Sequence, residues 1–293
     1  MNDDGDDAPA DAAGSPGDSD TTVARAYDPD SEHAFPDGRL DDVLAAVDAD
    51  PEIRTYLRAQ NVNAVTRMEY NDHGAKHIEI VRDRALRLYD LLKRGGVAFN
   101  GAADQGLDEA DEPVIVALAA TLHDVGHVVH RDDHVYYSIP LAADLLDRFL
   151  AQFDYYDVEA RVRMKAEVLH AILCHHTAET PLTREAGLIR VADALDMERG
   201  RSRIPYEKGG RGINTLSSRA IDRVELKPGD AADGHDGEDA PVLVEIEMVN
   251  AAGVYQVDNL LKAKLRDSLI EDLVRIVAIN TKGDDRLVER IEL

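Results

Sequence analysis

An apolar stretch that ends in a histidine and an aspartate constrains this chain more than any other feature. Residues 114–122 (VIVALAATL) carry no charge, and the motif His123-Asp124-Val125-Gly126-His127 follows directly. A helix this apolar on all sides is expected to be buried. An imidazole and a carboxylate are therefore placed side by side at the end of a buried helix, which indicates metal ligands.

Further candidate ligands lie on both sides of this motif. Nine of the eleven histidines fall between positions 73 and 176. His73 and His77 lie one turn apart on a predicted helix, and a lone histidine there would more often be a core or capping residue. Asp193 follows the mostly apolar segment 188–192, where an ionised carboxylate is costly to bury without a cation or donors. Asp193 and the His-Asp pair together favour a metal ligand at His77.

The order of these residues resembles that of the HD-domain metal-dependent phosphohydrolases, in which a His, a His-Asp pair and a distant Asp occur on a helical bundle. The resemblance covers roughly residues 70–200. It implies a divalent metal ion bound by His77, His123, Asp124 and Asp193. Gly126-His127 is similar to the deoxynucleoside triphosphate triphosphohydrolase branch, and Cys174-His175-His176 to branches with a second metal. The downstream spacing differs from both branches, so the number of ions stays open.

Two imidazoles and two carboxylates can bind a divalent ion, but this ligand set does not distinguish among Mn, Fe, Ni, Co, Zn and Mg. Such an ion lowers the pKa of bound water and neutralises phosphate charge. Other histidines would donate protons, hold substrate or bind a second ion, and the candidate catalytic residues are His127, His134, His170 and His175. For each of them, a structural or solvent-facing role is about as frequent.

A basic cluster follows Asp193 and comprises Arg199, Arg201, Arg203, Lys208 and Arg211. The planar guanidinium of arginine matches phosphate oxygens. We therefore predict that substrate phosphate binds beside the metal at Arg199, Arg201 and Arg203. The alternative is that these arginines pair with the surrounding acids, and the sequence supports both equally.

The chain is strongly acidic, with 58 Asp and Glu against 33 Lys and Arg and a net charge of −25. This acidic, halophile-like surface suits a salt-rich cytosol and argues against general DNA binding, because it repels phosphate backbones. The chain has a single cysteine, Cys174, so an intrachain disulfide is excluded. Cys174 is expected to be a small buried hydrophobic residue. Neither a membrane span nor a signal peptide is evident, so we expect a cytoplasmic protein.

Composition and periodicity divide the chain into three predicted parts. Residues 1–36 lack large apolar groups and are predicted to be a disordered acidic tail. Residues 37–205 are predicted to form a helical metal-binding catalytic domain, with helices near 73–94, 108–124, 134–152, 156–178 and 182–198. Residues 206–293 are predicted to form a small domain with strands near 222–226, 242–249, 272–280 and 286–292, and a helix near 257–267.

The expected fold class is therefore α+β, a mainly α-helical HD-type bundle followed by a strand-rich C-terminal domain. The leading functional hypothesis is hydrolysis of a phosphate ester or anhydride of a nucleotide-like small molecule by a metal-activated water. One alternative is a phosphodiesterase acting on a cyclic nucleotide or single-stranded RNA. Another is a non-catalytic, metal-stabilised nucleotide sensor whose C-terminal part binds a partner or forms a homo-oligomer. Residues 260–265 are predicted to be a packing helix rather than a recognition surface.

Overall fold

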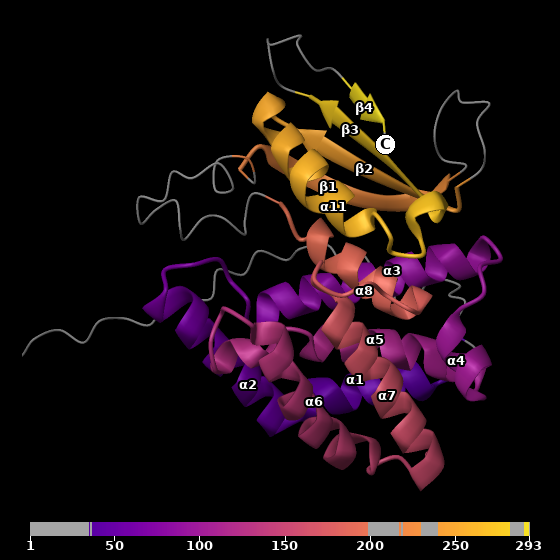
Figure 1. Ribbon diagram of the computed structural model, residues 1–293. Helices are drawn as coiled ribbons and strands as arrows, with labels where there is room; N and C mark the ends of the chain where they lie inside the picture. The colour runs from indigo at the N-terminus through magenta and orange to yellow at the C-terminus, as the bar shows by residue number, and fades with distance from the viewer. Residues whose placement is uncertain are drawn as a thin grey trace, which may run out of the picture.

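The computed structural model describes residues 35, 37–198, 217, 219–229 and 240–281, and the backbone of 290–292. Within these residues a helical part precedes a four-stranded sheet, which confirms the predicted α+β class (Figure 1). Apart from Phe35 the predicted acidic tail lies outside the described residues. The same holds for the whole predicted phosphate-binding cluster, Arg199, Arg201, Arg203, Lys208 and Arg211.

The helical part begins with α1 (Arg39–Ala49) and α2 (Pro51–Asn61), which Asp50 separates. The Asp50 carboxylate accepts hydrogen bonds from the backbone N–H groups of Glu52 and Ile53, at 2.9 and 3.0 Å. Pro51 then fills the first helical position, so this junction is a well-formed N-cap. The helices that follow are η1 (Val62–Arg67), α3 (Ala75–Arg94), α4 (Asn100–Gln105), η2 (Glu109–Asp111), α5 (Glu112–Leu122), η3 (Val125–Val128), α6 (His134–Leu150), α7 (Val158–Cys174) and α8 (Arg184–Leu195).

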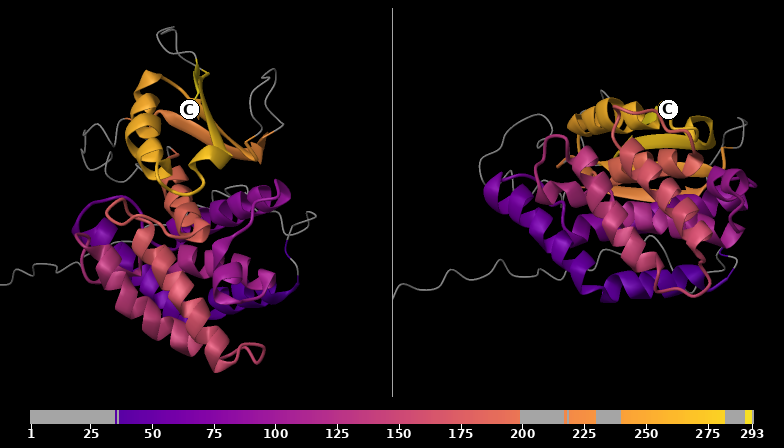
Figure 2. Two further views of the ribbon diagram at one scale, coloured as in Figure 1. Left: turned by 45° about the vertical axis from the view of Figure 1, so that its right-hand side comes forward. Right: turned by 60° about the horizontal axis from the view of Figure 1, so that its bottom comes forward.

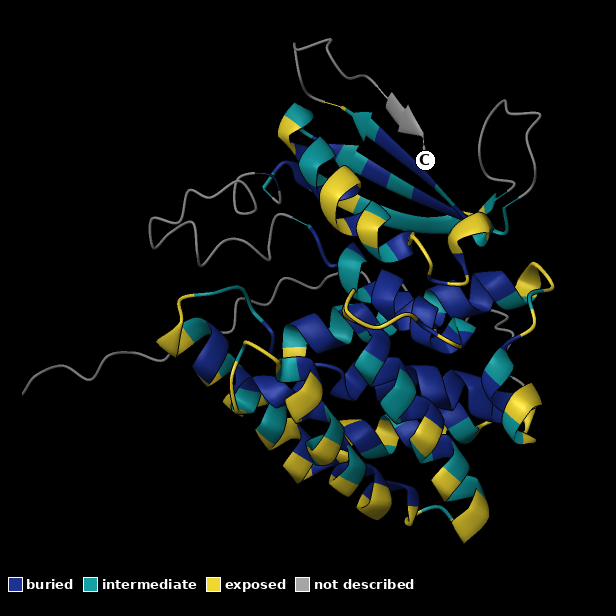
Figure 3. Cartoon of the chain, in the orientation of Figure 1, coloured by how far each residue is buried: buried dark blue, intermediate teal, exposed yellow. Residues whose placement is uncertain are grey.

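Helix α5 is the centre of the bundle. All of its residues are buried, and it contacts α1, α3, α7 and α8 (Figure 3). A helix with apolar residues on every side is stable only when neighbours cover all of it, so the other helices surround α5. The outer helices α6 and α7 instead expose part of their surface to solvent.

The sheet has the strand order β1-β2-β3-β4, with β1 (Ile221–Pro228), β2 (Val242–Met248), β3 (Val274–Asn280) and β4 (Arg290–Glu292). β1 and β2 are antiparallel, β2 and β3 are parallel, and β3 and β4 are antiparallel. A parallel pair needs a crossover connection. The crossover consists of η6 (Ala251–Gly253), η7 (Gln256–Leu261), α11 (Lys262–Leu265) and η8 (Glu271–Leu273), close to the helix predicted at 257–267.

The sheet and its crossover helices pack against the bundle, as two further views show (Figure 2). η7 and α11 contact α8, whereas β1 and β2 contact α3. At Gly187 on α8, a Cβ atom would lie 1.6 Å from the backbone oxygen of Ser268, so the close approach requires glycine. One apolar core therefore includes residues of both parts. The domain boundaries predicted at 37–205 and 206–293 stay predictions.

None of the described helices is both long and apolar enough to cross a lipid bilayer.

Candidate metal centre

Four polar side chains from separate parts of the bundle meet beside the end of α5. His77 lies on α3, His123 and Asp124 directly follow α5, and Asp193 lies on α8. The Nε2 atom of His77 is 3.3 Å from Nε2 of His123 and 3.4 Å from both Asp124 Oδ2 and Asp193 Oδ1. Nε2 of His123 is 3.6 Å from Asp124 Oδ2 and 3.8 Å from Asp193 Oδ1. The structure thus brings together all four predicted ligands.

The opposite ring nitrogens fix the orientation of the two imidazoles. Nδ1 of His77 is 2.5 Å from Asp196 Oδ2, and Nδ1 of His123 is 2.8 Å from the backbone oxygen of Ala120. Both acceptors place the imidazole proton on Nδ1, so two Nε2 lone pairs face each other. Two lone pairs at this distance repel unless a cation lies between them.

The spacing of the four atoms also fits a cation. Ligand atoms about 2.0–2.2 Å from a shared ion lie roughly 3.3–3.6 Å apart in tetrahedral geometry and roughly 2.8–3.1 Å apart as neighbours in octahedral geometry. Of the five separations given above, four lie between 3.3 and 3.6 Å and the longest, from His123 to Asp193, is 3.8 Å. The donor set therefore fits a divalent ion held by two imidazoles and two carboxylates.

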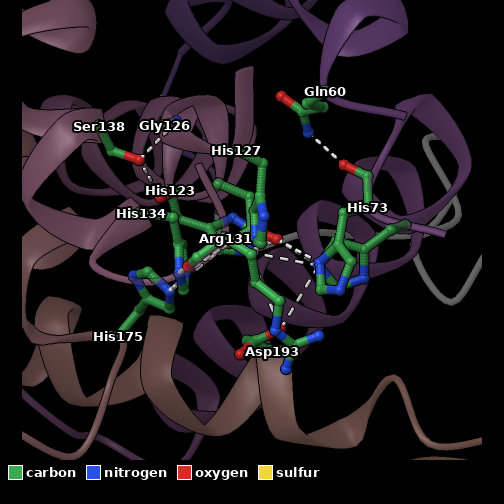
Figure 4. Close-up of polar contacts among 12 residues, drawn as sticks. Gln60, His73, His123, Gly126, His127, Arg131, His134, Ser138, His175 and Asp193 are labelled. Carbon is green, nitrogen blue, oxygen red and sulfur yellow. Dashed lines mark hydrogen bonds and ion pairs between the residues drawn. The ribbon is translucent and has the colours of Figure 1, made fainter. Parts of the chain in front are cut away.

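A second group of imidazoles faces the other oxygen of Asp124. Oδ1 of Asp124 lies 3.2 Å from Nε2 of His134 and 3.6 Å from Nε2 of both His127 and His175. His134 and His175 direct their Nδ1 atoms at backbone oxygens, 2.9 and 2.7 Å away, so their Nε2 atoms also face inward. His127 is 2% exposed, and neither of its ring nitrogens has a hydrogen-bond partner among the described residues. Figure 4 shows these rings side by side.

Burial and charge set the protonation states of this cluster. Burial alone would raise the pKa of Asp124, but the neighbouring imidazoles of His123 and His127 lower it well below its usual value. Burial lowers the pKa of His123, and it lowers the pKa of His127 to about 3. Burial also tends to lower the pKa of His134, but the hydrogen bond with Asp124 outweighs this and raises it. The cluster therefore combines an ionised carboxylate with mainly neutral imidazoles, the forms that bind metals.

Comparison with known proteins agrees with this geometry. A family model of the HD domain matches residues 73–198, the segment that contains the whole cluster. An uncharacterized protein of Methanocaldococcus jannaschii is 38% identical over 227 residues, which cover 78% of this chain and 84% of that protein. The chain belongs to the HD-domain metal-dependent phosphohydrolases. No solved structure matches the chain significantly. Members of this family bind divalent metals and act on phosphorylated substrates.

The turn that follows the His-Asp pair in this HD-domain protein depends on a glycine. A Cβ atom on Gly126 would lie 2.0 Å from the backbone oxygen of His134 and 2.6 Å from the backbone nitrogen of Ser138. The Ser138 hydroxyl accepts a hydrogen bond from Gly126 N and donates one to the backbone oxygen of His123, both at 2.8 Å (Figure 4). These contacts hold the start of α6 on the turn and bring His134 to Asp124.

Three further side chains contact the centre, and of these only His73 is a candidate ligand in the sequence. His73 precedes α3 instead of lying on it, and its Nδ1 is 2.7 Å from Asp124 Oδ2. Asp196 lies one turn after Asp193, and this spacing was a usable sequence signal. Lys264 on α11 forms an ion pair with Oδ2 of Asp193, and nothing in the local sequence indicates this contact.

Arg190 holds the segment after α7 that carries His175. Its Nε donates to the backbone oxygen of Cys174 at 2.9 Å, and its Nη2 donates to the backbone oxygen of His176 at 3.0 Å. Both acceptors flank His175, so this buried guanidinium fixes the backbone on either side of that imidazole. Cys174 itself is buried, as expected, and burial raises its pKa to about 11.

His170, one of the four predicted catalytic histidines, lies away from the cluster. Its Nε2 accepts a hydrogen bond from the backbone N–H of Leu182 at 3.0 Å, and its ring contacts Cys174. This ring joins α7 to the segment before α8. His170 is therefore not part of the catalytic set that we propose below.

A cavity of about 720 Å³ opens onto the cluster, within the size range of sites for small organic ligands. Its walls come from the bundle and from the C-terminal crossover. The segment 260–265 packs on α8, as predicted, but it also contributes Leu260, Ala263 and Lys264 to the cavity wall. The C-terminal part is thus a component of the site.

Proposed function

We propose that this protein hydrolyses a phosphate ester or anhydride of a nucleotide-like small molecule, with the ligands His77, His123, Asp124 and Asp193. The observation that carries the proposal is the pair of inward-facing Nε2 atoms, 3.3 Å apart, beside a cavity of about 720 Å³. A divalent ion bound there would supply activation of water and neutralisation of phosphate charge.

The other imidazoles of the cavity could transfer protons during the reaction. His134 and His175 line the cavity beside Asp124, with their Nε2 atoms 3.3 Å apart. Asp124 raises the pKa of His134, so this ring is the best placed to hold a proton at Nε2 and donate it to a leaving oxygen. Burial keeps the pKa of His175 well below its ordinary value, which suits it to accept a hydrogen bond or bind an ion.

The choice of a nucleotide-like substrate rests on the rest of the cavity wall. Tyr136 offers an aromatic surface, and Asn71 and Asn259 offer amide groups. Aromatic rings can stack on a nucleobase, and amides can pair with its polar edge. The volume is sufficient for a mononucleotide, whereas a long polymer would have to pass through the cavity.

The test uses the full chain loaded with Mn²⁺, freed of excess metal, and assayed for bound ions and for phosphate release. Substrates should include mononucleotides, nucleoside triphosphates, cyclic nucleotides and short single-stranded RNA. We expect His77→Gln and Asp193→Asn to lose the ion and to reduce turnover roughly 100-fold or more. The matched control, His170→Gln, changes a partly buried histidine outside the cluster and should keep the bound ion and the turnover of the unaltered chain.

The outcomes separate the competing functions. Cleavage of cyclic nucleotides or RNA alone would favour a phosphodiesterase, and tight nucleotide binding without turnover would favour a sensor. Two ions per chain would assign His127, His134 and His175 as ligands of a second ion. An Asp193→Asn variant that binds metal as the unaltered chain does would overturn the proposed centre.

A further inference from the structure

Arg131 lies in the wall of the metal-site cavity in a fixed orientation. Its guanidinium carbon is 3.3 Å from the centroid of the Tyr70 ring. Tyr70 in turn stacks on His73, with ring centroids 5.8 Å apart and an interplanar angle of 13°. Since Nδ1 of His73 is 2.7 Å from Asp124 Oδ2, two stacked contacts connect the guanidinium to the proposed metal ligands. Figure 4 shows Arg131 among the rings of the cluster.

Stacking uses the face of the guanidinium and leaves the donors on its edge available. Nη1 of Arg131 is buried and has no hydrogen-bond partner among the described residues. Within the described part of the chain, no carboxylate forms an ion pair with Arg131, although Asp132 and Asp133 are its neighbours in sequence. A buried charged donor without a partner costs free energy, so this position favours an anionic ligand.

The guanidinium of Arg131 lines the cavity beside the proposed metal centre. Arg131, Asp124, His127 and His134 all line the same space. Lys264 is the other Lys or Arg side chain among the described lining residues, and it is engaged in its ion pair with Asp193. Arg131 is therefore the lining cation whose donors remain for a ligand. The forked donors of a guanidinium match two oxygens of one phosphate group.

We infer that Arg131 binds the substrate phosphate, holding its non-bridging oxygens while the neighbouring cluster acts on the same group. This inference rests on the proposed function, and it places a phosphate contact in the bundle itself. The sequence also predicts phosphate binding at Arg199, Arg201 and Arg203, which lie outside the described residues.

Calorimetric titration with inorganic phosphate tests the inference on the full chain, both metal-free and loaded with Mn²⁺. Arg131→Gln should weaken phosphate binding at least about tenfold. Arg131→Lys should fall between this variant and the unaltered chain, because lysine keeps the charge but loses the planar fork. The matched control Arg163→Gln removes an arginine that pairs with Glu159 on α7, and it should leave phosphate binding unchanged.

A second pair of variants tests the stack without touching the arginine. Tyr70→Leu should weaken phosphate binding severalfold because the guanidinium loses its aromatic support. Tyr70→Phe keeps the ring and should bind phosphate as the unaltered chain does. Phosphate binding within twofold of the unaltered chain in Arg131→Gln would overturn the inference, as would an unaltered chain that binds no phosphate. If the unaltered chain does not bind Mn²⁺ but its phosphate binding still depends on Arg131, the proposed function alone would be overturned.

Discussion

Replacing Asp196 with asparagine should weaken divalent-metal binding by about 10- to 100-fold, or about 1.4–2.7 kcal/mol, without unfolding the protein. Oδ2 of Asp196 lies 2.5 Å from Nδ1 of His77, and the two side chains are 6% and 1% exposed. The carboxylate keeps the proton of His77 on Nδ1, which leaves the Nε2 lone pair facing the other proposed ligands. An asparagine can turn its NH₂ group toward Nδ1 and so favour a proton on Nε2.

The assay is a competition titration of Mn²⁺ against a chelating dye at neutral pH, paired with urea unfolding of the metal-free protein. Asp90→Asn is the matched control, because Asp90 is also buried on the bundle and bonds Arg87 and Arg94 at 2.9 and 2.8 Å. Those arginines are partly exposed, so the control should lose about 1–2 kcal/mol of stability and keep its metal affinity. An Asp196→Asn affinity within twofold of the unaltered chain would refute the reasoning, as would an equal loss in the control.

Two other consequences can be measured directly. Gly126→Ala should lose more than about 2 kcal/mol of stability in urea unfolding, because the new Cβ would lie 2.0 Å from the backbone oxygen of His134. Gly38→Ala has nothing within 4 Å of the added atom and should stay within about 0.5 kcal/mol, so equal effects would contradict the packing argument. Burial lowers the pKa of His123, so protons compete with metal only at a pH below its ordinary value. Metal affinity should therefore hold steady as pH falls from 7.5 to about 6.5, and a tenfold loss over that interval would be inconsistent with a neutral buried ring.

Much of the fold follows from local patterns. The uncharged residues 114–122 predicted a buried helix, and α5 is buried throughout because an all-apolar helix must be covered on every side. The strands predicted at 242–249 and 272–280 lie within a residue or two of β2 and β3. The helix predicted from 73 begins instead at Ala75, since His73 belongs to the segment before it. Helix ends depend on contacts that the periodicity does not contain.

In the candidate site too, the sequence indicated some features and only the structure decided others. The order of His77, His123, Asp124 and Asp193 indicated a family pattern, and their side chains converge. His170 and His175 looked equivalent in the sequence, yet five residues along a helix turn a side chain by roughly 140°, so only one of them can face the cluster. The structure selects His175.

Local sequence determined which segments are helices or strands and which residues are chemically able to bind a metal, because periodicity and side-chain chemistry are properties of short segments. Tertiary packing alone decided that Asp124 presents its two oxygens to two groups of imidazoles, that Tyr70 supports Arg131, and that Lys264 pairs with Asp193. These partners are far apart in the chain, and their contacts exist only because the bundle and the crossover helices bury a shared core.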